Sequence, residues 1–541
     1  MKKRLIYSGL CLAATLFAGC TKDFTKINTD PNATTADQFN PNFLLAQAQL
    51  NYSQTGYSQL LFQSMWTQSL ASTFSYYGNG DKYQQSGSFN DYIGRVYSEG
   101  YGAETYVEEI KNLTKGKTGY DNLNNIATIM KVLIVQRITD TYGDVPYSEA
   151  GQAKQGVFFP KFDKQQAIYT AMLTDLDAAL TALNPAKDKP SSDLFYSGDI
   201  AKWKRFGYSL MVRVAMRLTK VDPATAQKYV EKAAAAGTMA SIDDNAKVKT
   251  NNANGYSNAI VNALLTVDDF REVRWSKTLI DYMKSKSDSL RVRAIAEIAT
   301  GNGKKANENE TVAGDTAYAK QIGLPNGLDL NGGATDVTTD PNYPGATPAD
   351  PAVEKDAPAP LGKYSRPRLQ VYYTATSTIN PVDKSTINML LTYGETELLL
   401  AEAATRGWSV GGSAATHYAN ALAADMKSIA QINAAAAISD AAVAAYVAAH
   451  PLGASALQQI NTEYWVETST LFMFNENWTN WRRSGFPVLT PVKYPSQFDT
   501  EIPRRVIYPI TLQSTNPNGL SSGVASLSGG DKFSSRVWWD K

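Results

Sequence analysis

The sequence is poor in cysteine and histidine, which restricts the chemistry it can perform. Among 541 residues it has two cysteines, Cys11 and Cys20, and two histidines, His417 and His450. Because both cysteines lie within the first twenty residues, the rest of the chain can form neither a disulfide nor a cysteine-based zinc site. Neither histidine belongs to a nucleophile motif, and no phosphate-binding loop or H-E-x-x-H motif occurs. Serine or cysteine hydrolysis, nucleotide hydrolysis and zinc proteolysis are therefore disfavoured, and we expect no metal site.

Excess charge and long apolar runs are also missing. The 52 basic and 51 acidic side chains leave a formal net charge of +1, and no basic run points to a nucleic-acid partner. Residues 390–400 are apolar but interrupted by Tyr393, Glu395 and Glu397, so they predict a core helix and not a membrane span. Hydrophobic residues make up 43% of the chain and aromatic residues 11%, which is enough for a large core.

Paired carboxylates leave glycoside hydrolysis as an alternative function. Glu395 and Glu397 are two residues apart, and so are Asp175 and Asp177. A glycosidase needs two acids about 5–9 Å apart across one sugar, whereas residues i and i+2 of a helix point to different faces. We therefore expect these four carboxylates to lie on solvated helix faces.

The N-terminus carries the signature of an exported lipoprotein. Basic residues 2–4 precede an apolar stretch, residues 5–17, which is too short to span a membrane but suits a signal peptide. Residues 16–20 (LFAGC) resemble a bacterial lipobox, which implies removal of residues 1–19 and attachment of a lipid to Cys20. That lipid is the only cofactor-like group we expect. The alternative is an ordinary signal peptide, with Cys20 an unmodified thiol.

The remaining pattern is mostly helical. Apolar residues recur at helical spacing around residues 126–134, 168–183, 203–218, 398–403 and 414–422. The last of these patterns matches the second helix of a tetratricopeptide repeat, although no strict 34-residue period runs through the chain. Asp163, with Gln166 three residues later, predicts a capping box, and Asp199 predicts an N-cap. The clearest strand candidate is residues 368–376.

Residues 300–365 differ in composition from the rest of the chain. They are rich in Gly, Asn, Asp and Pro, which favour turns. Helical patterns resume on both sides, so we interpret this stretch as a surface loop insertion within one domain, residues 20–541. Asp329, Asn331 and Asp336 are candidate calcium ligands, but their spacing does not fit an EF-hand loop. Turn formation is the simpler explanation for them.

Several segments together resemble the SusD/RagB family of outer-membrane nutrient-binding lipoproteins, in particular its SusD-like branch from Bacteroidota. These segments are residues 20–24, 27–32, 140–150, 160–163, 209–218, 393–407, 481–485, 502–505 and 537–540. The resemblance implies a mostly α, tetratricopeptide-like scaffold with a loop-rich ligand face and few short strands. It also implies a non-catalytic protein, lipid-anchored in the outer membrane and facing the cell exterior. The implied partner is a SusC-like, TonB-dependent transporter.

The family resemblance leaves more than one ligand open. Most members bind glycans, so we expect capture of oligosaccharides and their delivery to the transporter. The alternatives are a peptide-binding uptake lipoprotein, a structural lid without its own ligand and, from another class, a glycoside hydrolase.

Two aromatic-rich segments are the predicted ligand site. A sugar offers C–H faces and hydroxyl edges, so its site needs flat aromatic rings with amide, carboxylate or guanidinium partners. Aromatic residues beside the Gly/Asn-rich residues 78–81 have less reason to be core than those at helical spacing. The candidate ligand contacts are Trp66, Tyr76, Tyr77, Tyr83, Tyr256, Arg271 and Trp275. Packing and capping are the alternative roles. The tryptophans expected to hold the scaffold together are Trp478, Trp481, Trp538 and Trp539.

Overall fold

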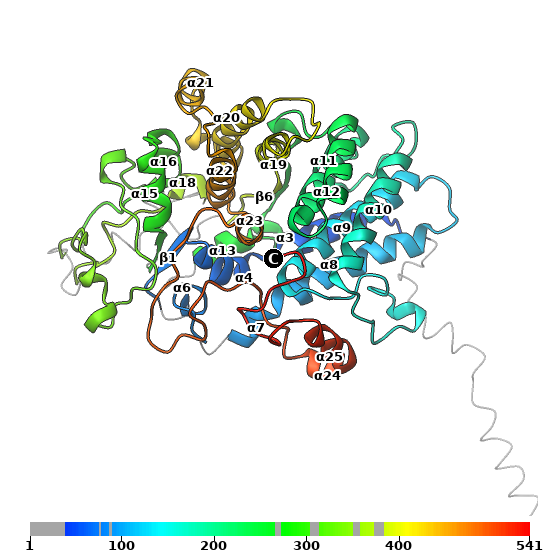
Figure 1. Ribbon diagram of the computed structural model, residues 1–541, viewed down its shortest axis with the longest axis horizontal. Helices are drawn as coiled ribbons and strands as arrows, with labels where there is room; N and C mark the ends of the chain where they lie inside the picture. The colour runs from blue at the N-terminus through cyan, green and yellow to red at the C-terminus, as the bar shows by residue number, and fades with distance from the viewer. Residues whose placement is uncertain are drawn as a thin grey trace, which may run out of the picture. The chain divides into compact units, whose positions relative to one another are not determined.

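The computed structural model describes residues 38–74, 77–85, 89–265, 272–302, 313–349, 357–372 and 384–541. The chain divides into two units, Met1–Pro41 and Asn42–Lys541, and the second contains the elements described below (Figure 1). Cys20 lies outside the described residues, as do the predicted ligand residues Tyr76 and Arg271. No helix within the described ranges is long and apolar enough to cross a membrane.

Helices dominate this second unit. The helices of its first half are α3 (Asn42–Ser53), α4 (Gly56–Ser58), the π-helical turn η1 (Gln59–Gln63), α5 (Ser64–Trp66), α6 (Gly78–Asp81), α7 (Phe89–Ile93), α8 (Arg95–Thr114), α9 (Asp121–Tyr142), α10 (Gln165–Ala182), α11 (Ile200–Met216), α12 (Pro223–Ala236) and α13 (Ala259–Leu264). Those of its second half are α15 (Lys277–Ser285), α16 (Ser289–Ile295), α18 (Leu369–Tyr372), α19 (Tyr393–Thr405), α20 (Ala414–Ile432), α21 (Asp440–Ala449), α22 (Ala456–Thr470), α23 (Phe474–Ser484), α24 (Leu512–Thr515) and α25 (Pro517–Ala525). Short 3₁₀ turns punctuate the loops at Ala153–Gln155, Arg217–Lys220, Ile242–Asp244, Asn252–Asn254, Tyr318–Lys320, Gly333–Thr335, Val337–Thr339 and Ala434–Ala436.

Consecutive helices pack in pairs, which gives the tetratricopeptide-like scaffold that the sequence predicts. The pairs are α8 with α9, α11 with α12, α19 with α20, and α22 with α23. Gly407, whose φ of +83° is left-handed, follows the C-terminal end of α19, and the Ser413 side chain caps α20 by accepting the backbone N–H of Thr416. The predicted buried stripe of α20 is confirmed, since Tyr418, Ala421 and Leu422 are buried.

One predicted cap is confirmed and the other is wrong. Asp199 caps α11 by accepting hydrogen bonds from the backbone N–H groups of Ala201 and Lys202. At α10 the side chain of Asp144 takes the capping role, accepting the N–H of Gln165 at 2.8 Å. Asp163 cannot do so, because it pairs with Val145 in a β-bridge and its carboxylate accepts the N–H groups of residues 147 and 148.

Among the described residues the strands form three two-stranded antiparallel sheets. They are β1 (Leu70–Ser72) with β3 (Val273–Trp275), β2 (Ala246–Lys249) with β6 (Ile387–Leu391), and β4 (Ala296–Glu297) with β5 (Arg366–Pro367). The predicted strand at 368–376 is wrong within its described part, because Leu369–Tyr372 is the short helix α18. Leu369 and Tyr372 are both buried at helical i, i+3 spacing, and the ring of Tyr372 stacks on Phe472 at 4.2 Å.

The turn-rich insertion has a small core of its own. Leu324, Val337, Leu361 and Tyr364 pack with Ala71 from β1 in a cluster separate from the main core. The carboxylate of Asp329 accepts hydrogen bonds from Asn331 N–H, from the Thr335 hydroxyl and from the Tyr494 hydroxyl. Asp329 therefore makes the turn contacts that its sequence context favours. Within the described residues no group of acidic, histidine or cysteine side chains could hold a metal ion.

Candidate functional site

The two predicted ligand segments meet in the structure. Strand β1, which follows Trp66, pairs with β3 so that Leu70 lies opposite Trp275 and Ser72 opposite Val273. The insertion joins them, because the side-chain amide of Asn326 donates to Leu70 O at 2.8 Å and to the Asp81 carboxylate at 2.6 Å. Residues far apart in sequence thus form one loop-rich region, which we call the loop face: residues 66–74, 77–85, 272–276 and 322–328.

The two tryptophans of the loop face are buried in its base. Trp66 packs on Trp478 and Phe62 with ring centroids 5.1 and 5.3 Å apart. The indole N–H of Trp275 donates to Ile295 O at 3.1 Å. Both side chains are inaccessible to solvent, so here the structure gives them the packing role that the sequence left as the alternative.

Tyr77 and Tyr83 are also buried, and Tyr256 is exposed. The backbone oxygen of Tyr83 accepts the N–H of Phe498 at 2.7 Å, and burial raises the pKa of its hydroxyl. Tyr256, by contrast, is 38% exposed, and its hydroxyl lies 3.5 Å from Gln47 of α3. Among the described candidates Tyr256 alone keeps a large open face, and ligand contact by any of them stays a prediction.

The Gly/Asn-rich segment is a buried helix and not an exposed turn. Gly80 of α6 packs directly on η1, and a Cβ atom there would lie 2.0 Å from Leu61 O. The buried Asp81 carboxylate also accepts the N–H of Gly327 at 2.8 Å. The small residues therefore permit close helix packing, which is why the aromatics beside them are buried.

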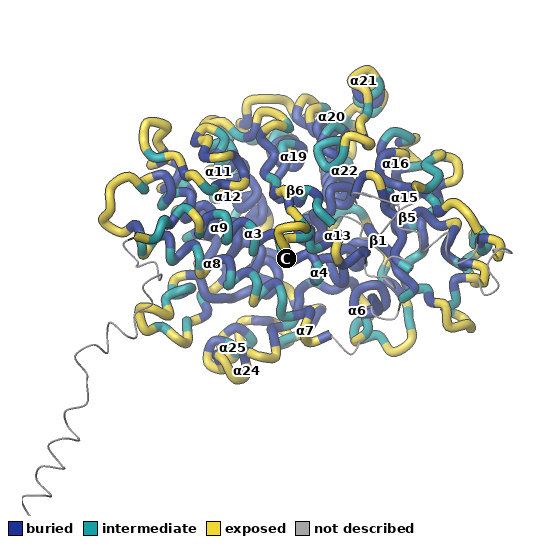
Figure 2. Tube along the Cα trace, turned by 180° about the vertical axis from the view of Figure 1, so that it is seen from behind, coloured by how far each residue is buried: buried dark blue, intermediate teal, exposed yellow. Residues whose placement is uncertain are grey.

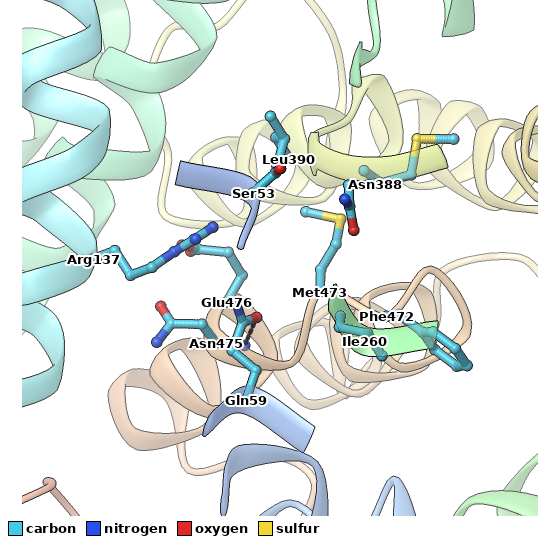
Figure 3. Close-up of a pocket in the computed structure, with 11 residues that line it drawn as sticks. Ser53, Gln59, Arg137, Ile260, Asn388, Leu390, Phe472, Met473, Asn475 and Glu476 are labelled. Atoms are coloured by element: carbon cyan, nitrogen blue, oxygen red, sulfur yellow. Dashed lines mark hydrogen bonds between the residues drawn. The ribbon is translucent and has the colours of Figure 1, made fainter. Parts of the chain in front are cut away.

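A cavity lies at the centre of the molecule, where α3, α9, β6 and α23 meet (Figure 3). It has about 20 Å³ of space for the centres of water molecules, enough for one or two waters and too little for a sugar ring. Arg137 and Glu476 extend toward one another at its edge. Among the described residues, Nε of Arg137 and Oδ1 of Asn475 have no hydrogen-bond partner.

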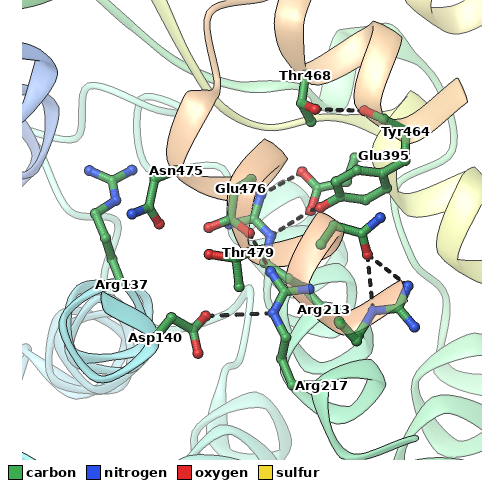
Figure 4. Close-up of polar contacts among 12 residues, drawn as sticks. Arg137, Asp140, Arg213, Arg217, Glu395, Tyr464, Thr468, Asn475, Glu476 and Thr479 are labelled. Atoms are coloured by element: carbon green, nitrogen blue, oxygen red, sulfur yellow. Dashed lines mark hydrogen bonds and ion pairs between the residues drawn. The ribbon is translucent and has the colours of Figure 1, made fainter. Parts of the chain in front are cut away.

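A buried charge network adjoins this cavity (Figure 4). Arg213 donates twice to Glu395 at 2.6 Å, and Arg217 donates to Glu476 at 2.6 Å. Burial opposes ionisation of Glu476, but Arg213 and Arg217 hold its pKa below the usual value. Since opposite charges are matched and hydrogen-bonded, the network holds α11, α19 and α23 together.

The prediction for the carboxylate pair in α19 is wrong about burial and right about direction. Glu395 and Glu397 are buried, so the expectation of solvated faces is wrong for them. They do point to different partners, because Glu395 binds Arg213 whereas Glu397 binds His417 at 3.0 Å. No pattern in the sequence predicted the network as a whole. The sequence did contain a signal for this network, because Arg213 and Arg217, four residues apart, share one face of a helix with a buried apolar stripe.

The remaining tryptophans and histidines have structural contacts. Trp478, Trp481 and Trp539 are buried, as predicted for the scaffold, whereas Trp538 is only half-buried. His450 lies at the C-terminal end of α21, with its ring nitrogens 2.8 Å from Tyr446 O and Lys286 O.

Paired helices that carry a loop-rich face define a tetratricopeptide-like binding scaffold. Residues 31–509 match the family model SusD-like_2, described as "Starch-binding associating with outer membrane". The chain therefore belongs to the SusD-like family, which is associated with the outer membrane. A search of curated proteins finds no match to this chain.

Solved structures support this assignment. A chitin-binding protein is 30% identical over 93% of this chain and 100% of its own, with a TM-score of 0.74. A chitin-binding SusD homolog from Flavobacterium johnsoniae is 23% identical, covering 92% of this chain and 98% of its own, with a TM-score of 0.69. A SusD homolog from Bacteroides uniformis is also 23% identical, over 92% and 99% of the two chains, with a TM-score of 0.68. The two more distant structures share the fold.

Proposed function

We propose that this protein is a cell-surface lipoprotein that binds glycans without cleaving them and delivers them to a SusC-like, TonB-dependent transporter. The observation that carries the proposal is the 30% identity to a chitin-binding protein along 93% of the chain, within a family described as starch-binding. The lipid on Cys20 would hold the protein at the outer membrane beside its transporter.

The same observation favours chitin-type oligosaccharides as the first ligands to test. Each N-acetylglucosamine unit offers an apolar ring face together with hydroxyl and acetamido groups, so its site needs aromatic rings and amide or carboxylate partners. Tyr256 is exposed and lies two residues after the exposed amide of Asn254, so it offers this combination among the described candidates.

The test is a calorimetric binding screen on the chain from residue 21 onward. We expect chitohexaose to bind with a dissociation constant in the micromolar range, and mass spectrometry to recover it uncleaved after long incubation. Maltohexaose, a starch fragment, and a mixed peptide library are the comparison ligands. Binding of peptides but of no oligosaccharide would favour the peptide-uptake alternative, and sustained cleavage would favour a hydrolase.

A further inference from the structure

An open cleft lies away from the loop face, between the start of α10 and the C-terminal segment. It has a volume of about 470 Å³, within the range of small-molecule sites, and is lined by residues 143–144, 164–166, 526–528, 536–538 and 540–541. A shallower recess of about 600 Å³ continues from it along α10 and shares Lys164 and Gln166. We call the two together the α10 cleft. Figure 1 places α10 and β1 on opposite sides of the molecule.

The floor of the cleft is rigid. The indole N–H of Trp539 donates to the buried Asp140 carboxylate at 2.9 Å, and Asp540 is paired with Arg504. Tyr508 donates to Asp144 O at 2.7 Å from the other side. A wall held by buried contacts on both sides can bind a ligand without first becoming ordered.

The lining of the cleft combines an aromatic ring with hydrogen-bond donors and acceptors. Trp538 is half-buried and lines the cleft, while its neighbours Val537 and Trp539 are buried in the core. Gln166 and Arg536 line the same cleft and are exposed, so they offer an amide and a guanidinium group. An aromatic face with donors and acceptors around it is the combination that a sugar ring requires.

The buried Gln165 fixes one wall of the cleft. It is 1% exposed, and its side-chain N–H donates to Thr139 O at 2.8 Å. Its backbone N–H donates to the Asp144 carboxylate at 2.8 Å. The exposed groups of the lining are therefore the ones that can contact a ligand.

We propose that the α10 cleft is a second saccharide site, which binds a short neutral oligosaccharide independently of the loop face. The ligand class rests on the proposed glycan-binding function, whereas the location rests on the cleft itself. Two separated sites would let the protein hold a long chain at two points, which raises avidity without new contacts.

Hydrogen exchange of the chain from residue 21, with and without chitotriose or maltotriose, tests the location. We expect slower exchange at residues 164–171 and 526–541. Gln166→Ala and Arg536→Ala change exposed side chains and should each weaken this site about two- to tenfold, the effect of losing one hydrogen bond. Trp538→Ala should weaken it about tenfold or more. Gln513→Ala and Arg293→Ala, exposed residues outside the cleft, are the matched controls.

The outcomes separate the two proposals. Saccharide binding with unchanged exchange at the cleft, and unchanged affinity in the Gln166 and Arg536 variants, would overturn the second site and leave the proposed function standing. Absence of binding to any saccharide in the wild-type protein would overturn the proposed function as well. Protection of the cleft by a peptide, and by no saccharide, would also overturn the assignment.

Discussion

At the scale of single residues, buried charges have partners that decide how stability responds to pH. Glu402 is buried in α19, and both its carboxylate oxygens accept hydrogen bonds from Arg483, at 2.7 and 2.6 Å. Burial alone would raise its pKa, but Arg483 and Arg406 lower the pKa of Glu402 to about 2, from an ordinary value of 4.5. The ionised form is therefore the one that stabilises the fold.

We predict that the free energy of unfolding falls as the pH drops from 4.5 toward 2. In this window the unfolded chain takes up a proton at Glu402 and the folded chain does not. The stabilisation is present above pH 4.5, and about 3 kcal/mol of it is lost by pH 2. Urea unfolding at several pH values between 6 and 3 measures the free energy of unfolding.

The Glu402→Gln substitution should lower the free energy of unfolding by about 3–5 kcal/mol at pH 6, because Arg483 stays buried without its charge partner. The difference in free energy of unfolding between this variant and the wild-type protein should become smaller toward pH 3. The exposed Glu501→Gln variant is the control, and parallel pH curves for wild type and Glu402→Gln would contradict the prediction.

Asp425 has the opposite effect on the pH dependence of stability. It contacts Arg291, which also contacts two further carboxylates, Asp288 and Glu463. Burial raises the pKa of Asp425 to about 6, although Arg291 opposes the shift. Its contribution to stability is therefore present at low pH and is lost as the pH rises through 6. Residue-scale chemistry of this kind depends on partners from different helices, which the linear sequence does not bring together.

At the scale of secondary-structure elements, local sequence patterns predicted the helices, but they did not predict how α10 is capped. The apolar stripe of α10 was visible because this helix buries one face and exposes the other, and the stripes of α9 and α11 were visible because apolar residues recur at helical spacing along them. The cap of α10 comes from Asp144, 21 residues before its partner Gln165. A cap that reaches across a loop leaves no signature in the four-residue window where caps are normally sought.

We predict that Gly80→Ala destabilises the protein by about 1–3 kcal/mol, as overpacking does in other cores. The new methyl group would meet Leu61 O at 2.0 Å and Met65 Cβ at 2.9 Å. Gly78→Ala, in the same short helix, is the matched control, since its Cβ would lie 3.4 Å from the flexible end of Gln84. Thermal or urea unfolding compares the two, and equal stability would show that α6 does not pack on η1 as described.

At the scale of the whole molecule, the scaffold brings distant segments together around a single large core. Figure 2 shows the buried chain running through the centre, with exposed chain at α21, α24 and the loops. The main core includes residues from α3 through to Trp539, near the end of the chain. The loop face depends on this arrangement, since β1 and β3 are some 200 residues apart in sequence.

We predict that Cys20→Ala releases the protein from the membrane fraction, because the thioether-linked lipid would be its anchor. Cys11→Ala, within the expected signal peptide, is the matched control and should leave the protein membrane-bound. Fractionation with immunoblotting, and mass spectrometry of the N-terminal peptide, measure both. Retention of the Cys20→Ala variant in the membrane would contradict lipid anchoring at this residue.

The helical class, the SusD-like family and the turn-rich character of residues 300–365 can be read from the sequence, because these depend on local periodicity, composition and motif order. The exposure of each aromatic residue depends on the folded structure. Trp66 and Trp275, which are predicted ligand contacts, are buried, whereas Trp538, a predicted scaffold residue, packs against the main core and also lines an open cleft. Burial depends on what packs on a residue from elsewhere in the chain, and that information is not local.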